Sequence, residues 1–347
     1  MKARFEKYTL HFKQPAGTSR GTPRTKDTWF LYVDKDGKTG VGECGMFKGL
    51  SYDDRPNYEE KLQWLCNHIH LPEEELREAL RPYPAIWTGY EIAMRSVNSD
   101  TPFQLWNTPF SVGEQAIPIN GLVWMGNEEF MLEQIKVKLA AGFSVIKIKV
   151  GAIDFEKELQ LLQFLRDRYS ASEITIRLDA NGAFTPQEAE EKLAKLAKFD
   201  IHSIEQPIRQ GQRDAMRELC SKNIIPIALD EELIGITGSA EKGIVLDEIK
   251  PQYIILKPTL VGGFSGSEEW IAAAQTNNIP WWATSALESN VGLNAIAQWV
   301  SSYEPLLPQG LGTGSLFTNN INSPLEVHEG SLWSNKSLAW DTNQLNF

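Results

Sequence analysis

The chain has 347 residues, a hydrophobic fraction of 42%, a charged fraction of 23% and a net charge of −11. This length and composition are typical of a soluble globular protein with one large α/β domain and a smaller one. The negative charge argues against nucleic acid or an anionic membrane surface as a partner.

The cysteines and the N-terminal sequence indicate the cellular compartment. Cys44, Cys66 and Cys220 lie far apart and lack the spacing of a metal site. The N-terminal residues lack the apolar core of a signal peptide, and no apolar run approaches the roughly 20 residues that span a bilayer. We therefore expect reduced thiols and a cytoplasmic location. The oligomeric state stays open.

Residues 1–114 are expected to form an α+β capping domain. Strands are predicted over residues 5–12 and 28–44, the second with a hairpin turn at Asp36 and Gly37. Between them, residues 13–27 are rich in Gly, Pro, Ser and Thr and predict a loop. Helical patterns follow at residues 57–70, 72–80 and 85–97. We expect the domain that they complete to cover a larger one.

From residue 115 onward, short apolar strands alternate with helices. There are eight strand candidates, at residues 117–126, 144–151, 174–182, 201–207, 225–232, 253–263, 279–289 and 308–317. One intervening helix is well marked, with Thr185 as N-cap, Pro186 next and Glu188 completing a capping box. The pattern predicts a (β/α)8-type (TIM-like) barrel over residues 115–316, with residues 317–347 returning to the cap.

Charged and polar side chains stand at the C-terminal ends of the predicted strands, where such barrels place their active sites. In chain order they are Lys147, Lys149, Asp179, Asn181, Glu205, Asp230, Glu231, Lys257, Ser285 and Glu288. Three carboxylates gathered at one mouth would repel one another strongly. A hard divalent cation removes that cost, and oxygen ligands without Cys or His favour Mg²⁺, with Mn²⁺ as a substitute. We therefore predict a metal site at Asp179, Glu205 and Asp230.

The alternation of the second barrel strand points Lys147 and Lys149 to one face. Lys149 beside a metal ion is predicted to act as a general base, with Lys257 opposite. This arrangement suits removal of a proton α to a carboxylate, because metal and ammonium charges stabilise the resulting enediolate. Arg177 is predicted to orient a substrate carboxylate below the metal, and Asn181 to bind metal water or substrate.

The ordered motifs "KIK", "DAN", "EQP", "ALDE" and "LKP" resemble those of the enolase superfamily, within its muconate-lactonizing group. The resemblance covers essentially the whole chain and is strongest to the o-succinylbenzoate synthase family. It implies that Asp179, Glu205 and Asp230 bind Mg²⁺ and that Lys149 and Lys257 are catalytic.

The implied reaction is the syn-dehydration of 2-succinyl-6-hydroxy-2,4-cyclohexadiene-1-carboxylate to o-succinylbenzoate in menaquinone biosynthesis. Strand eight reads "GLGTGSLF" and lacks the carboxylates of dipeptide epimerases, which argues against dipeptide substrates. Two alternatives stay open. One is an N-succinylamino-acid racemase, alone or combined with the dehydratase; the other is a catalytically inactive barrel that binds a ligand.

Further substrate contacts are predicted outside the metal and lysine set. Lys147, Gly263 of "VGGF" and Ser285 of "SALES" belong to the barrel, and Ser19 and Arg20 belong to the loop that we expect to fold over the site. Phe47 and Leu50 of the cap are expected either to seal the site or to pack at the domain junction.

Overall fold

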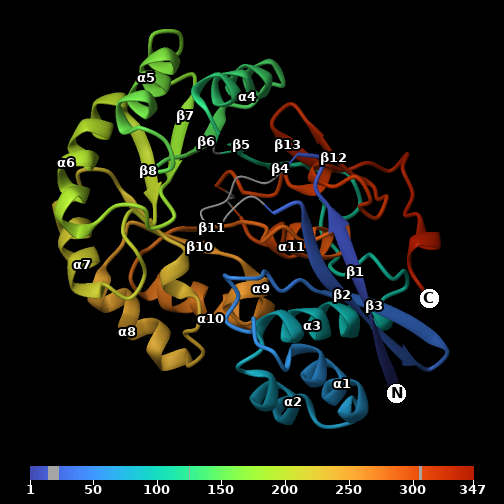
Figure 1. Cartoon of the computed structure of the whole chain (residues 1–347). Coiled ribbons are helices and arrows are strands. Elements are labelled where there is room, and N and C mark those ends of the chain that lie inside the picture. Colours follow the sequence, from blue (N-terminus) through green and yellow to red (C-terminus); the bar gives the residue numbers. More distant parts are fainter. Residues whose placement is uncertain (15–22, 125, 305–306) are drawn as a thin grey trace.

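The N-terminal part of the chain forms an antiparallel sheet covered by helices (Figure 1). The computed structural model describes residues 1–14, 23–124, 126–304 and 307–347, so Ser19 and Arg20 lie outside the described residues. The sheet has the order β1 (Lys2–His11), β2 (Thr25–Lys35) and β3 (Lys38–Cys44). Its helices are α1 (Tyr58–His68), α2 (Glu73–Leu80) and α3 (Pro84–Asn98).

Local sequence explains the turn and the helix packing of this cap. The predicted hairpin is confirmed, because Lys35 pairs with Lys38 across Asp36 and Gly37, which both have positive φ. Helix α3 packs tightly on β3, since a Cβ at Gly42 would lie 1.9 Å from the carbonyl oxygen of Gly89. The predicted loop was too long at its C-terminal end, because pairing with β1 draws Thr25, Lys26 and Asp27 into β2.

Seven parallel strands form the barrel, in the order β11-β10-β9-β8-β7-β6-β5. Their bounds are β5 (Gly121–Val123), β6 (Val145–Lys149), β7 (Thr175–Asp179), β8 (Ile201–Glu205), β9 (Ile227–Leu229), β10 (Tyr253–Leu256) and β11 (Trp281–Ala283). The eighth predicted strand is present only as isolated bridges, which pair Gln309 with Ile119 and Gly310 with Thr284. These bridges join both edges of the sheet, so the predicted TIM-like barrel is confirmed. Pro308 and the glycines of this segment explain why no longer ladder forms.

Helices follow the barrel strands, and α4 to α8 lie on the outside of the sheet (Figure 1). They are α4 (Glu128–Ala140), α5 (Phe155–Arg166), α6 (Pro186–Leu196), α7 (Arg213–Lys222), α8 (Ser239–Ile249), α9 (Pro258–Val261), α10 (Gly263–Thr276) and α11 (Asn290–Val300). The capping box predicted for α6 is present, with Thr185 and Glu188 bonding each other's backbone N–H groups. Short 3-10 turns are η1 (Ala197–Phe199), η2 (Glu231–Leu233), η3 (Gly314–Leu316) and η4 (Thr342–Gln344).

The C-terminal segment contacts both parts of the molecule. Its hairpin, β12 (Leu325–His328) and β13 (Ser331–Ser334), pairs with β4 (Ile117–Pro118) before the first barrel strand. Towards the cap, the backbone N–H of Thr318 donates to the His11 carbonyl oxygen over 2.8 Å, and the Asn346 N–H donates to the Tyr32 hydroxyl oxygen over 3.1 Å. The predicted domain boundaries at residues 114 and 316 stay predictions.

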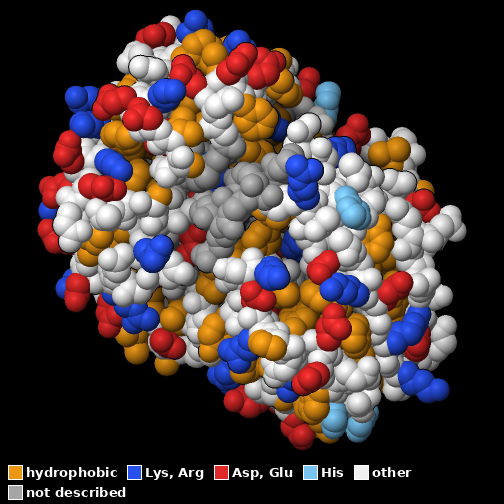
Figure 2. All heavy atoms as spheres, viewed as in Figure 1, with side chains coloured by type: hydrophobic (Ala, Val, Ile, Leu, Met, Phe, Trp, Pro, Cys, Tyr) orange, Lys and Arg blue, Asp and Glu red, His pale blue; other side chains and the backbone are white. Residues whose placement is uncertain are grey.

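No helix in the described part of the chain is long and apolar enough to cross a membrane. Acidic and basic side chains are interspersed on the face that Figure 2 shows. The absence of nucleic acid and membrane partners stays a prediction, as does the cytoplasmic location.

Candidate active site

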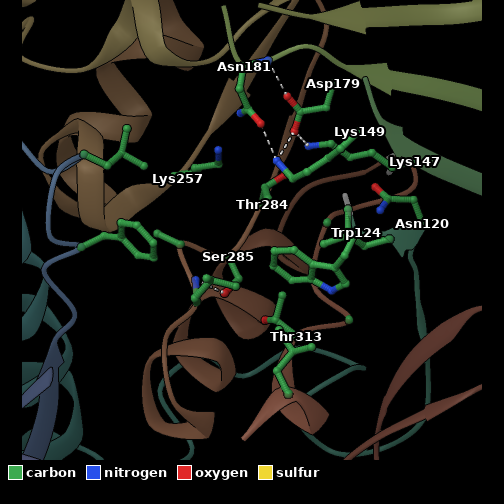
Figure 3. A pocket seen from close by; sticks show the side chains of 18 of the residues that line it. Asn120, Trp124, Lys147, Lys149, Asp179, Asn181, Lys257, Thr284, Ser285 and Thr313 are labelled. Carbon is green, nitrogen blue, oxygen red and sulfur yellow. Dashed lines mark hydrogen bonds and ion pairs between the residues drawn. The ribbon is translucent and has the colours of Figure 1, made fainter. Parts of the chain in front are cut away.

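The register of the barrel strands brings the predicted charged residues into adjacent positions. Lys149 on β6 pairs with Asp179 on β7, and Asp179 pairs with Glu205 on β8. Asp230 follows the next strand, β9, and Lys257 follows β10. All five therefore lie at the C-terminal ends of neighbouring strands. In Figure 3, Lys147, Lys149 and Asp179 lie on one side of the cavity and Lys257 lies across from them.

Two ammonium groups separate the three predicted metal-binding carboxylates. Lys147 Nζ donates to a Glu205 carboxylate oxygen and lies 3.0 Å from Asp179 Oδ2. Lys257 Nζ donates to an Asp230 carboxylate oxygen and lies 3.8 Å from Glu205 Oε1. The three carboxylate residues are 1–2% exposed, so each is buried against a cation.

Mutual electrostatics shift the pKa values in this cluster. Burial acts to raise the pKa of Asp179, but the ammonium groups of Lys147, Lys149 and Lys257 bring it below its usual range. Burial also opposes the charge of Lys257, yet the facing carboxylates, Asp230 first, raise the pKa of this lysine. Lys257 is therefore held in its charged form in this arrangement.

The fit of a metal ion can be judged from the donor atoms. Among the described residues, no three His, Cys, Asp or Glu side chains converge closely enough to hold a metal ion. The lysine ammonium groups lie between the carboxylates instead. Burial, together with Asp179 and Asp230, raises the pKa of Glu205 to about 8, and Glu205 Oε1 accepts no hydrogen bond from a described residue. The repulsion that the lysines offset only in part, and the buried oxygen without a hydrogen bond, fit a hard divalent cation.

Lys149 differs from the other two lysines because, among the described residues, it pairs with one of the three carboxylates and Lys147 and Lys257 each pair with two. Its Nζ donates to Asp179 Oδ2 over 3.0 Å and to Asn181 Oδ1 over 2.6 Å. Asn181 has a φ of 45°, and its Nδ2 donates to Glu231 Oε1 over 3.0 Å. Lys149, Asn181 and Glu231 all line the cavity. The predicted base therefore faces the space that a substrate would occupy.

The cavity above this cluster has a volume of about 140 Å³. A cavity of about 150 Å³ accommodates one benzene ring, so a single six-membered ring fits. Its apolar walls come from both domains; they are Phe47, Leu50, Leu122, Trp124, Phe143, Ala286, Leu287 and Leu316. Phe47 and Leu50 thus contribute to the wall of the cavity and also belong to a cluster at the domain junction.

The polar residues of this cavity that sequence reasoning missed include Asn120, Thr284 and Thr313 (Figure 3). Asn120 Oδ1, Thr284 Oγ1 and Thr313 Oγ1 are buried without a hydrogen-bond partner among the described residues. Thr284 follows β11 and Thr313 follows the bridges of the eighth strand, so the strand-end rule could have found these two, whereas Asn120 precedes β5. Such free polar atoms in a cavity are suited to bind polar substrate groups.

The other predicted substrate contacts differ in their positions. Lys147 and Ser285 line the cavity, whereas Arg177 and Gly263 are not among its lining residues. Arg177 is 2% exposed, stacks on Trp282 at 4.1 Å and donates from Nη1 to the Pro308 carbonyl oxygen over 2.7 Å. Arg177 therefore packs in the barrel interior, and its predicted role in orienting a substrate carboxylate stays a prediction.

Gly263 lies at the cap–barrel junction, and its predicted substrate contact stays a prediction. A Cβ there would lie 2.1 Å from Glu91 Oε2 and 2.8 Å from a Trp87 ring carbon, both on α3. Glycine is therefore required by the close approach of α3 to the start of α10.

Comparisons with known proteins agree with the geometry. The family model described as "Enolase C-terminal domain-like" matches residues 131–336. The o-succinylbenzoate synthase of Desulfotalea psychrophila is 43% identical, covering 96% of this chain and 98% of its own length. The crystal structure of MenC from Desulfotalea psychrophila LSv54 has a TM-score of 0.85 at 40% identity, over 96% of this chain and 99% of that chain. An N-succinylamino acid racemase from Amycolatopsis sp is 24% identical over 92% of this chain and 88% of its own length.

Proposed function

This chain belongs to the enolase superfamily, and we propose that it is an o-succinylbenzoate synthase of menaquinone biosynthesis. As such it is a lyase that dehydrates 2-succinyl-6-hydroxy-2,4-cyclohexadiene-1-carboxylate. The similarity to the Desulfotalea psychrophila enzyme, 43% identity across 96% of the chain, is the observation that carries the proposal. The ring-sized cavity beside Lys149 and Lys257 supports it.

Enzymes of this superfamily generally use a divalent metal ion. We assign Mg²⁺ to this chain, with Mn²⁺ as a substitute, because Asp179, Glu205 and Asp230 offer only oxygen donors. When bound, the ion supplies Lewis-acid stabilisation for negative charge that develops on the substrate carboxylate. Lys147 then serves as a charged neighbour that positions Asp179 and Glu205, because its Nζ contacts both.

Lys149 is assigned the proton transfers. Its Nζ lines the cavity, and Asp179 and Asn181 fix its direction. In neutral form, Nζ accepts the proton α to the substrate carboxylate, which leaves an enediolate. The same Nζ then gives this proton to the departing hydroxyl group, so that one water molecule leaves from one face of the ring. These two proton transfers make up the syn-elimination that the family resemblance implies.

Lys257 is assigned an electrostatic role on the side of the cavity opposite Lys149. The carboxylates around it, led by Asp230, raise its pKa against the effect of burial. A permanent ammonium group across the cavity from Lys149 stabilises the enediolate where its charge develops.

The second candidate is an N-succinylamino-acid racemase, alone or within the same protein. It is favoured by the Amycolatopsis relative and by the two lysines on opposite sides of the cavity, each of which could serve one face of the α-carbon. Solvent deuterium exchange into an N-succinylamino acid would support this activity. Rapid dehydration of the cyclohexadiene substrate without any exchange would dismiss it.

The test of the main proposal is a direct assay of the purified chain with the cyclohexadiene substrate. We expect o-succinylbenzoate to form with Mg²⁺, the activity to be lost with EDTA and to return when Mg²⁺ is restored. No turnover with Mg²⁺ would contradict the proposal, and a calorimetric titration without Mg²⁺ binding would favour an inactive ligand-binding barrel.

A further inference from the structure

Lys26 on β2 is a buried lysine at the junction of cap and barrel. It is 6% exposed, and its Nζ has no hydrogen-bond partner within residues 1–14, 23–124, 126–304 and 307–347. Burial lowers its pKa, and the carboxylates of Glu43 and Glu288 oppose that shift. A buried amine without a hydrogen bond is costly, so the charges that face it must account for its position.

Glu43 from β3 and Glu288 from the segment after β11 approach each other beside Lys26. A Cβ at Gly292 would lie 2.9 Å from Glu43 Oε2 and 2.8 Å from Glu288 Cβ. A Cβ at Gly45 would lie 3.5 Å from Lys26 Nζ and 3.2 Å from Glu288 Cγ. One cap lysine therefore faces two acids, one from the cap and one from the barrel.

The barrel acid, Glu288, holds a tight turn. Its Oε2 accepts a hydrogen bond from Ser285 Oγ over 2.6 Å, and its Oε1 accepts one from Thr259 Oγ1 over 2.6 Å. Ser285 Oγ in turn accepts from the backbone N–H of Leu287 over 3.0 Å. Leu287 has a φ of 62°, a left-handed conformation that is uncommon for a leucine and must be held by its surroundings.

This turn forms one wall of the active-site cavity. Ser285, Ala286 and Leu287 all line it, and Leu287 packs with Phe47 of the cap. Any change in the turn would therefore alter the space next to the substrate, while Lys149 and the carboxylate row on the far strands would stay in place.

We propose that Lys26 is a positioning residue that sets substrate affinity by holding Glu288, and through it the Ser285–Leu287 turn, against the cavity. Without its ammonium group, two buried carboxylates would face each other in a low-dielectric junction. Their repulsion would push the Glu288 carboxylate away from its position, and the hydrogen bonds that it accepts from Ser285 Oγ and Thr259 Oγ1 would weaken. The inference deepens the proposed function and rests on it.

Steady-state kinetics of Lys26→Met test this role. We expect the KM for the cyclohexadiene substrate to rise at least about tenfold while kcat changes less than about threefold, because the chemistry at Lys149 is untouched. Lys26→Arg keeps the charge and should recover most of the affinity. The double variant K26M/E288Q removes both charges, and its KM should be no higher than that of the worse single variant.

Lys242→Met is the matched control. Lys242 is 1% exposed on α8 and pairs with Glu269 over 2.7 Å, away from the active-site cavity. Its loss should lower the melting temperature and leave KM unchanged. The inference is overturned if K26M lowers only the melting temperature, as K242M does, or if the effects of K26M and E288Q on KM multiply independently. If K26M does not fold, the KM of K26R and of the double variant decide between these outcomes. An inactive wild-type chain would instead overturn the proposed function.

Discussion

Replacing Lys149 by alanine separates the chemical step from folding and metal binding. The side chain is 11% exposed and projects into the cavity, so its removal enlarges the cavity without opening the core. Asp179 keeps a cation, because Lys147 Nζ remains 3.0 Å from Asp179 Oδ2. We therefore expect the free energy of unfolding to change by less than about 1 kcal/mol, as for a substitution that creates no buried unpaired charge.

The kinetic effect of Lys149→Ala should be large. A positioned general base contributes about 10²–10⁴-fold to the rate, and this corresponds to about 3–5 kcal/mol in the activation free energy. The dehydration assay measures kcat, calorimetry measures Mg²⁺ affinity, and thermal unfolding checks the fold. Lys195→Ala is a control, because Lys195 is 41% exposed and pairs with Glu191 on the surface of α6. A Lys149→Ala variant that keeps more than a tenth of the wild-type kcat would refute the assignment.

Three further predictions concern charge and metal. Glu205→Gln should lower Mg²⁺ affinity by at least about 100-fold in calorimetry, since loss of an outer-shell partner alone costs about 10–100-fold; unchanged affinity would remove Glu205 from the metal site. A hundredfold excess of Mg²⁺ over its Kd should raise the free energy of unfolding by about 2.7 kcal/mol in denaturant titrations, and EDTA should abolish the gain. Burial raises the pKa of Asp53 from 3.8 to about 7. The folded state thus keeps a proton that the unfolded chain loses, and stability should fall between these pH values by an amount on the order of 4 kcal/mol. Thermal unfolding at several pH values measures this fall, and Asp53→Asn should flatten it. An unchanged dependence of stability on pH would contradict the raised pKa of Asp53.

Strand alternation and strand-end position were sufficient to predict most of the charged cluster. Lys149 and Asp179, and Asp179 and Glu205, are neighbours in the observed register because parallel strands carry their C-terminal residues to one edge. The sequence could not show that Lys147 and Lys257 pair directly with the carboxylates, because side-chain reach across strands depends on the curvature of the barrel. The roles of these residues in binding metal and substrate stay predictions.

Contacts with distant parts of the chain set the positions of Arg177 and Lys26, which the sequence did not predict. Arg177 shares the inward face with Asp179, but it lies one layer deeper, where Trp282 and the Pro308 carbonyl oxygen bind it. Lys26 was assigned to a loop by composition, and pairing with β1 draws it into β2. Both positions depend on segments distant in sequence, which local patterns do not contain.

A crystal structure of the chain with Mg²⁺ and o-succinylbenzoate tests the central claim most directly. The account predicts one ion bound by Asp179, Glu205 and Asp230 together, with Lys149 Nζ and Lys257 Nζ on opposite sides of the aromatic ring. An ion bound elsewhere, or carboxylates that share no ion in the presence of product, would contradict it.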